Sequence, residues 1–195
     1  EPLVAAPCDE DGGVEAGDRG HGGVGCGGLG VVVPADPARL PHQLDPVRQA
    51  AHPQLGQVGV VIPVAAFGRR VPQEPWLRFR DKTGIPVVID GAASTDRLIS
   101  SPQGFVGPLP VALSFHATKV FNTFEGGAVV TNNDALAEKM RLMRNFGFAG
   151  FDNVIHPGTN GKMTEICAAM GLTNLDAIDD IVAANRRNYQ AYRDA

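Results

Sequence analysis

From residue 58 onward, short apolar runs alternate with stretches of helical periodicity. Apolar runs predict strands over residues 58–66, 85–90, 111–115 and 128–131. Residues 73–83 predict a helix, because Trp76, Leu77 and Phe79 supply an apolar surface and Gly84 is a typical C-terminal stop. Strands that alternate with helices predict the α/β class, with a mostly parallel sheet flanked by helices.

Three more helices and one loop complete the predicted domain. Asn133 is a typical N-cap for a helix over 134–146, and Gly147 would end it. Further helices are predicted over 163–175 and 178–193. Residues 94–108 are rich in Ser, Gly and Pro, so this stretch is predicted to be a loop.

The first 57 residues follow a different pattern. Residues 11–30 are dense in glycine and residues 34–53 are rich in proline, without helical or strand periodicity. Such a chain loses much backbone entropy on ordering. We therefore predict an irregular segment over 1–57 and a folded domain over 58–195.

One motif inside this segment suggests a dinucleotide site. Residues 23–28 fit G-x-G-x-x-G, but that pattern requires a strand before it and a helix after it. Here another glycine-rich stretch precedes it, and Leu29–Val33, which resembles a strand, follows it. A nucleotide-dependent oxidoreductase is therefore one hypothesis for the function, and it depends on this glycine run alone.

Composition narrows the classes of function. The chain has 195 residues and a net charge of -4, and its basic residues form no stripe, which argues against a nucleic-acid partner. No apolar run approaches the roughly 18 residues that span a bilayer, and the start does not resemble a signal peptide. The three cysteines indicate neither a disulfide framework nor a zinc site. We expect a cytoplasmic protein without a metal site.

The candidate chemistry lies where two predicted strands end. Asp90 closes the run 85–90, and Lys119 follows the run 111–115 in a polar turn. Ligands of open α/β sheets bind at the carboxyl ends of strands, so both side chains would lie at one edge. A lysine that forms a Schiff base, and a carboxylate that holds a pyridine nitrogen protonated, suit pyridoxal phosphate (PLP).

Four ordered motifs carry a family resemblance. They are Val88-Ile89-Asp90-Gly91-Ala92-Ala93-Ser94, Ser114-Phe115-His116-Ala117-Thr118-Lys119, Glu125-Gly126-Gly127-Ala128-Val129-Val130-Thr131 and residues 158–172. Together they resemble the DegT/StrS-like nucleotide-sugar aminotransferases, a branch of the fold-type I PLP enzymes. The resemblance implies that residues 58–195 are a partial large domain of that fold.

The resemblance also implies roles for individual residues. Lys119 would be the Schiff-base lysine and would move the proton during transamination. Asp90 would bind the pyridine nitrogen, and Ser114 the cofactor phosphate. Asn160 would reach the phosphate of a neighbouring subunit's cofactor, which implies a homodimer. Ala93 departs from the Gln or His that many family members use to contact the ring hydroxyl.

By resemblance, the substrates would be a nucleotide-linked keto-sugar and an amino-acid donor, with glutamate expected. The family's chains are about twice as long, and their first segment holds the cofactor phosphate at a helix N-terminus. This difference favours an alternative hypothesis, a non-catalytic remnant of such an enzyme. Leu3–Cys8 also resembles the family, and the likeness then stops at Asp9 and resumes near Val58. We therefore hypothesise that 9–57 are translated in a shifted reading frame.

Overall fold

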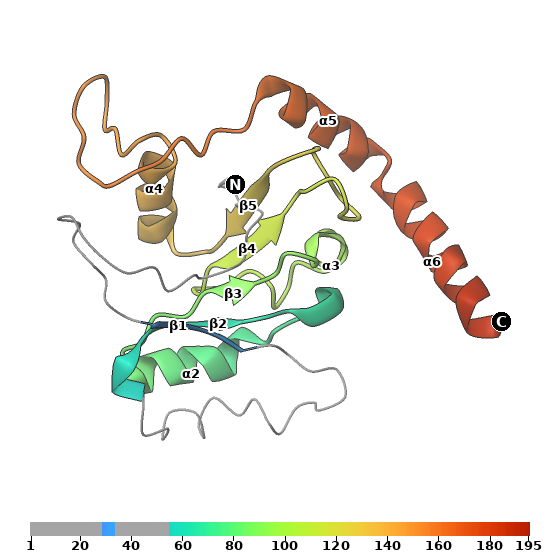
Figure 1. The fold of residues 1–195 in the computed structure, drawn as a ribbon, viewed down its shortest axis with the longest axis horizontal. Helices are drawn as coiled ribbons and strands as arrows, with labels where there is room; N and C mark the ends of the chain where they lie inside the picture. Colours follow the sequence, from blue (N-terminus) through green and yellow to red (C-terminus); the bar gives the residue numbers. More distant parts are fainter. Residues whose placement is uncertain (1–28, 34–54) are drawn as a thin grey trace.

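The computed structural model describes residues 29–33 as backbone and residues 55–195 with their side chains. The predictions for residues 1–28 and 34–54, including the irregular segment, the glycine motif and the shifted frame, lie outside the described residues. Figure 1 shows the elements in chain order. They are β1 (Leu29–Val33), η1 (Leu55–Gln57), β2 (Val58–Pro63), η2 (Ala66–Gly68), α2 (Gln73–Thr83), β3 (Ile89–Asp90), α3 (Thr95–Ser100), β4 (Val111–Ser114), β5 (Gly127–Val130), α4 (Asp134–Met143), α5 (Glu165–Asp176) and α6 (Ile178–Asp194).

The strands pair in a mixed pattern. β1 is parallel to β2, β3 is parallel to β4, and β4 is antiparallel to β5. Isolated parallel bridges, Val61 with Val87 and Val64 with Asp90, join β2 to β3. The fold is therefore α/β, and the strand predicted for Leu29–Val33 is confirmed as β1.

Two predicted helix boundaries are confirmed in detail. α2 covers 73–83, and Gly84 closes it in the left-handed conformation with φ 72°. Asn133 is the N-cap of α4, since its side chain accepts a hydrogen bond from the backbone N–H of Leu136 at 3.1 Å.

The loop predicted over 94–108 is wrong in its first part, because α3 occupies Thr95–Ser100. The residues at its start, Ser94, Thr95 and Asp96, are types that favour helix beginnings, and Leu98 packs against the core. Tertiary packing therefore outweighs the loop-like composition of the stretch.

β3 is shorter than the predicted strand over 85–90. Pro86 has no backbone N–H, so the ladder is interrupted there, and only its carbonyl pairs, with the N–H of Val61 at 3.0 Å. α4 ends at Met143, before the predicted 146, and Phe146 follows with φ 59°.

The apolar core lies between the sheet and the helices that cover it. Its buried members are Val61, Trp76, Phe79, Val87, Ile89, Leu109, Val111, Leu113, Phe115, Phe121, Ala128 and Ile178. Gln73 of α2 is also buried and bonds the 101–110 loop. Its amide nitrogen donates to the carbonyl of Phe105 at 2.7 Å, and its oxygen accepts from the N–H of Leu109 at 3.1 Å. Gln73 thereby fixes the entry of the chain into β4.

α5 and α6 extend from the body as a C-terminal arm (Figure 1). Ile166 and Leu172 of α5 are 74% and 67% exposed, whereas Ile178, at the start of α6, is buried. Among the described helices, none combines the length and apolar character needed to cross a membrane.

Candidate cofactor site

The candidate site is built at one edge of the sheet, where β3 and β4 end. The two strands are parallel neighbours, and Asp90 pairs in register with Ala112. Asp90 is the last residue of β3, and Ser114 is the last residue of β4. Both strands therefore end at the edge that α/β proteins use for ligands.

The turn after β3 holds Asp90 in a defined orientation. Its Oδ1 accepts a hydrogen bond from the backbone N–H of Ala92 at 2.9 Å. Its main-chain carbonyl accepts from Ala65 N–H at 2.7 Å. Gly91 is needed here, because an added Cβ would lie 2.7 Å from Cγ1 of Val111. The carboxylate is half-buried, and no hydrogen bond within the described chain occupies its Oδ2.

The segment that carries Lys119 connects β4 to β5. Its ends are joined by hydrogen bonds from the N–H of Phe115 to the carbonyl of Gly126 at 2.7 Å and from the N–H of Thr123 to the carbonyl of Phe115 at 2.9 Å. The Phe115 and Phe121 rings pack edge to face at 4.9 Å, and both are buried. Within the segment, the N–H of Lys119 donates to the carbonyl of His116 at 2.9 Å, which forms a tight turn.

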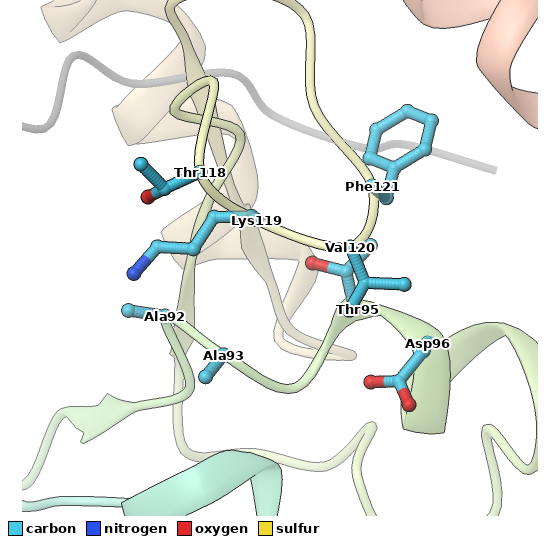
Figure 2. Close-up of a pocket in the computed structure, with 8 residues that line it drawn as sticks. All are labelled: Ala92, Ala93, Thr95, Asp96, Thr118, Lys119, Val120 and Phe121. Carbon is cyan, nitrogen blue, oxygen red and sulfur yellow. The ribbon is translucent and has the colours of Figure 1, made fainter. Parts of the chain in front are cut away.

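A pocket of about 240 Å³ lies between this turn and the loop after β3. Figure 2 shows the side chain of Lys119 extending toward Ala92 and Ala93. The pocket is lined by Ala92, Ala93, Thr95, Asp96, Thr118, Lys119, Val120 and Phe121. The lysine is half-buried, so its amine faces a partly enclosed space in place of bulk solvent.

His116 contacts the turn that carries Lys119, and it is not among the residues that line the pocket. Its Nδ1 lies 2.9 Å from Oγ1 of Thr118, and its Nε2 lies 3.6 Å from a carboxylate oxygen of Glu125. The N–H of Thr118 also donates to Nδ1 at 3.3 Å, which favours the tautomer with the proton on Nε2. The hydroxyl of Thr118 is therefore already engaged.

Ser114 lies beside the pocket and does not line it. Its side chain is buried, and its oxygen accepts from the N–H of His116 at 3.3 Å. The hydroxyl proton stays available to donate to an anion at the edge of the sheet.

Asn160 is the one predicted site residue that the structure does not bring to this edge. It is exposed and forms an antiparallel bridge with Asn145, and it is not among the residues that line the pocket. The nearby Lys162 lies over the ring of Phe146, with its nitrogen 4.2 Å from the centroid. A contact of Asn160 with a neighbouring subunit's cofactor stays a prediction.

Sequence reasoning missed two polar residues of the pocket, Thr95 and Asp96. Both follow Asp90 closely in the chain, but they lie in the stretch that was predicted to be a loop. Thr95 is only 7% exposed, and its hydroxyl has no hydrogen-bond partner among the described residues. Ser94, which does not line the pocket, has the same feature, and buried polar groups of this kind are commonly paired with ordered water.

These residues fit the aldehyde and ring of PLP. The amine of Lys119 lines the pocket, and the carboxylate of Asp90, which lies at the same sheet edge without lining the pocket, is of the type that pairs with the pyridine nitrogen. The pocket volume of about 240 Å³ is below the roughly 300–1,000 Å³ of ordinary ligand sites, so it encloses only part of such a ligand. The described residues hold no cluster of three or more potential metal ligands.

Comparison with curated proteins finds sugar transaminases. The chain is 36% identical over 136 residues to the dTDP-4-amino-4,6-dideoxy-D-glucose transaminase of Shigella dysenteriae, a match that covers 68% of this chain and 36% of that protein. It is 30% identical over 165 residues to the GDP-perosamine synthase of Caulobacter vibrioides, covering 83% of this chain and 43% of the relative. The chain thus spans less than half the length of these relatives.

Solved structures give the same result. A structure of DesI in the presence of its TDP-sugar product matches with a TM-score of 0.63 and 38% identity, over 77% of this chain and 38% of that one. A PLP-dependent aminotransferase from Bacillus cereus also matches with a TM-score of 0.63, at 28% identity, over 78% of this chain and 40% of the other.

The family model for DegT/DnrJ/EryC1/StrS aminotransferases matches residues 24–195. The match includes residues 24–57, which the hydrophobic pattern sets apart, so the boundary at residue 57 stays a prediction. Because the match covers most of the sequence, this chain belongs to the DegT/DnrJ/EryC1/StrS aminotransferase family.

Proposed function

We propose that this chain is part of a PLP-dependent aminotransferase that acts on a nucleotide-linked keto-sugar. One observation carries the proposal: the amine of Lys119 faces a pocket at the sheet edge where Asp90 also lies. The relatives support it, since they include a dTDP-sugar transaminase and a structure with a TDP-sugar product.

Lys119 is the residue that would bind the cofactor covalently and carry the proton. PLP, when bound, supplies an electron sink for the carbon next to the reacting nitrogen. The Nζ of Lys119 would bond the cofactor aldehyde and, once displaced by an amino donor, would carry the proton between the cofactor carbon and the substrate carbon. The half-buried turn would hold this nitrogen close to that carbon.

Asp90 and Ser114 would orient the cofactor. Oδ2 of Asp90 would hold a proton at the pyridine nitrogen, while Oδ1 stays bonded to the N–H of Ala92 at 2.9 Å. The hydroxyl of Ser114 would donate to the phosphate. Asn160 of a second subunit would contribute to the same phosphate, which makes the complete site a property of a homodimer.

The wider expectations concern the whole protein. We expect a mostly parallel sheet in the complete large domain, glutamate as the amino donor, and a cytoplasmic location. We expect no nucleic-acid or membrane partner. The small pocket volume of about 240 Å³ favours one alternative, a non-catalytic remnant that cannot hold the cofactor by itself.

The experiment that separates these functions is intact mass spectrometry after incubation with PLP and borohydride. The proposal predicts one cofactor adduct per chain, lost in Lys119→Ala and kept in Lys139→Ala. Lys139 is an exposed residue of α4 and serves as the matched control. Absence of an adduct, or adducts that survive Lys119→Ala, would favour the remnant.

A further inference from the structure

Asp96 is a carboxylate in the pocket wall without a partner among the described residues. The residue is half-buried, and no hydrogen bond or ion pair within the described part of the chain involves its side chain. The adjacent Arg97 is exposed and does not pair with it. Glu74, by contrast, pairs on its own helix with Arg78 at 2.8 Å. The oxygens of Asp96 therefore keep their lone pairs for a ligand.

The start of α3 accounts for the residue type but not for the place of the side chain. Acidic residues in the first turn of a helix are favoured by the helix dipole, and Asp96 lies in the first turn of α3. Asp134 is likewise in the first turn of α4, but it is exposed and is not among the residues that line the pocket. The two aspartates therefore share a helix position and differ in access to the pocket.

The carboxylate of Asp96 and the amine of Lys119 lie on opposite sides of the pocket (Figure 2). The amine ends beside Ala92, and the carboxylate extends from the start of α3. The apolar lining residues are Ala92, Ala93, Val120 and Phe121. An ionised carboxylate in partly apolar surroundings accepts stronger hydrogen bonds than one in bulk water.

We propose that Asp96 is a specificity-determining residue, whose carboxylate accepts hydrogen bonds from hydroxyls of the sugar ring. This inference rests on the proposed function. A sugar whose reacting carbon lies at Nζ of Lys119 extends its ring across the pocket, and the hydroxyls on its distant carbons face Asp96. Each carboxylate oxygen can accept from one hydroxyl, while the apolar lining suits the C–H groups of the ring.

The same charge separates the two substrates of the reaction. An amino-acid donor such as glutamate carries carboxylates of its own, which Asp96 repels, whereas a sugar ring is neutral and offers hydroxyl donors. A like charge in a binding site discriminates against the wrong ligand as effectively as a new contact favours the right one. Removal of the charge should therefore act on the two substrates in opposite directions.

The test measures binding to protein whose PLP has been fixed on Lys119 by borohydride, so that no reaction occurs. Calorimetry compares dTDP-glucose, UDP-glucose and GDP-mannose, each with its bare nucleotide, because the difference isolates the sugar. Asp96→Asn should weaken binding of the preferred sugar nucleotide about ten- to one-hundred-fold, as expected for loss of a hydrogen bond to a charged group. The bare nucleotide should bind as before, and glutamate should bind as tightly as before or more tightly.

Two further variants guard against a loss of structure. Asp134→Asn removes the matching charge of α4 and should leave the affinity for every ligand unchanged. Asp96→Ser lacks the charge but keeps a residue type that favours helix beginnings, so it should repeat the loss of sugar binding. Each variant is expected to form the Lys119 adduct and to unfold near the wild-type denaturant concentration.

The outcomes separate the two proposals. Wild-type protein that forms no Lys119 adduct, or that binds none of the sugar nucleotides, would overturn the proposed function and the role of Asp96 with it. Tight binding of a sugar nucleotide that is the same in Asp96→Asn would overturn the role of Asp96 alone. So would an equal loss for the sugar nucleotide and its bare nucleotide, or a loss confined to glutamate, which would place the donor's amine at this carboxylate.

Discussion

Two leucines show how differently the chain uses apolar residues. Leu113 lies in β4 and is 1% exposed, whereas Leu172 lies in α5 and is 67% exposed. The first is packed within the core beneath the candidate site. The second belongs to a C-terminal arm that extends from the body (Figure 1). The same side chain therefore stabilises the sheet in one region and presents an apolar surface in the other.

The two regions meet at the lysine segment. Asn174 of α5 donates to the carbonyl of Asn122 at 2.8 Å. Gly171 lies so close to Thr123 that an added Cβ would be 2.9 Å from its Cγ2. The arm therefore contacts the segment that carries Lys119, while the rigid placement of that segment comes from the buried Phe115 and Phe121. The buried aromatic residues hold the lysine segment in place, and the C-terminal arm adds contacts at its margin.

The largest effect is expected from Leu113→Ala. Removing a fully buried leucine loses transfer free energy and leaves a cavity, so the free energy of unfolding should fall by about 2–5 kcal/mol. Denaturant titration measures this loss. A change below about 1 kcal/mol would mean that the sheet is not packed as described, and the contrast with the arm would disappear.

A smaller effect is expected from Asn133→Ala. The variant removes the side-chain cap of α4, which packs on the body through the buried Ala137, so the free energy of unfolding should fall by about 1 kcal/mol. Thr164→Ala is the comparison in the arm, since Thr164 caps α5 by accepting from the N–H of Cys167 at 3.3 Å.

The two cap variants should differ in how much of the molecule loses stability. Because α5 has few buried residues, loss of its cap should speed amide hydrogen exchange within α5 and leave global unfolding nearly unchanged. Equal losses of global stability in both variants would show that the arm and the body unfold as one cooperative unit.

The smallest effect is expected from Leu172→Ala. An exposed leucine loses little contact on truncation, so the free energy of unfolding of the single chain should change by less than about 0.5 kcal/mol. Unfolding is measured over a range of protein concentrations, with Leu113→Ala as the buried counterpart. A larger loss that grows with protein concentration would show that a second chain covers this face in solution.

Much of the fold was predictable because the local signals for helix ends and strands agree with the burial that the structure shows. The α2 boundaries follow from a helical apolar surface and Gly84, and the α4 cap follows from Asn133. Asp90 and Lys119 were both placed at one sheet edge, because parallel strands with apolar sequences end together. The assignment of individual roles to Lys119, Asp90, Ser114 and Asn160 stays a prediction.

The sequence did not reveal α3 or the burial of its first residue, Thr95. Ser, Thr and Asp favour turns as well as helix beginnings, so composition could not distinguish the two, and the packing of Leu98 decided the outcome. An unpaired hydroxyl is a property of three-dimensional surroundings. Nothing in the identity of Thr95 separates it from Thr131, whose hydroxyl is satisfied.

The sequence by itself determined the class of the fold, the strand that ends at Asp90, the turn that carries Lys119, and the family. These depend on local periodicity and on residue order within short motifs. Only the tertiary structure decided that the lysine turn and the loop after β3 enclose a pocket, and that Thr95, one of its lining residues, has a buried hydroxyl without a partner in the described part of the chain. It also decided which leucine is buried and which is exposed. The physical reason is that burial and hydrogen-bond satisfaction depend on contacts between segments far apart in the chain.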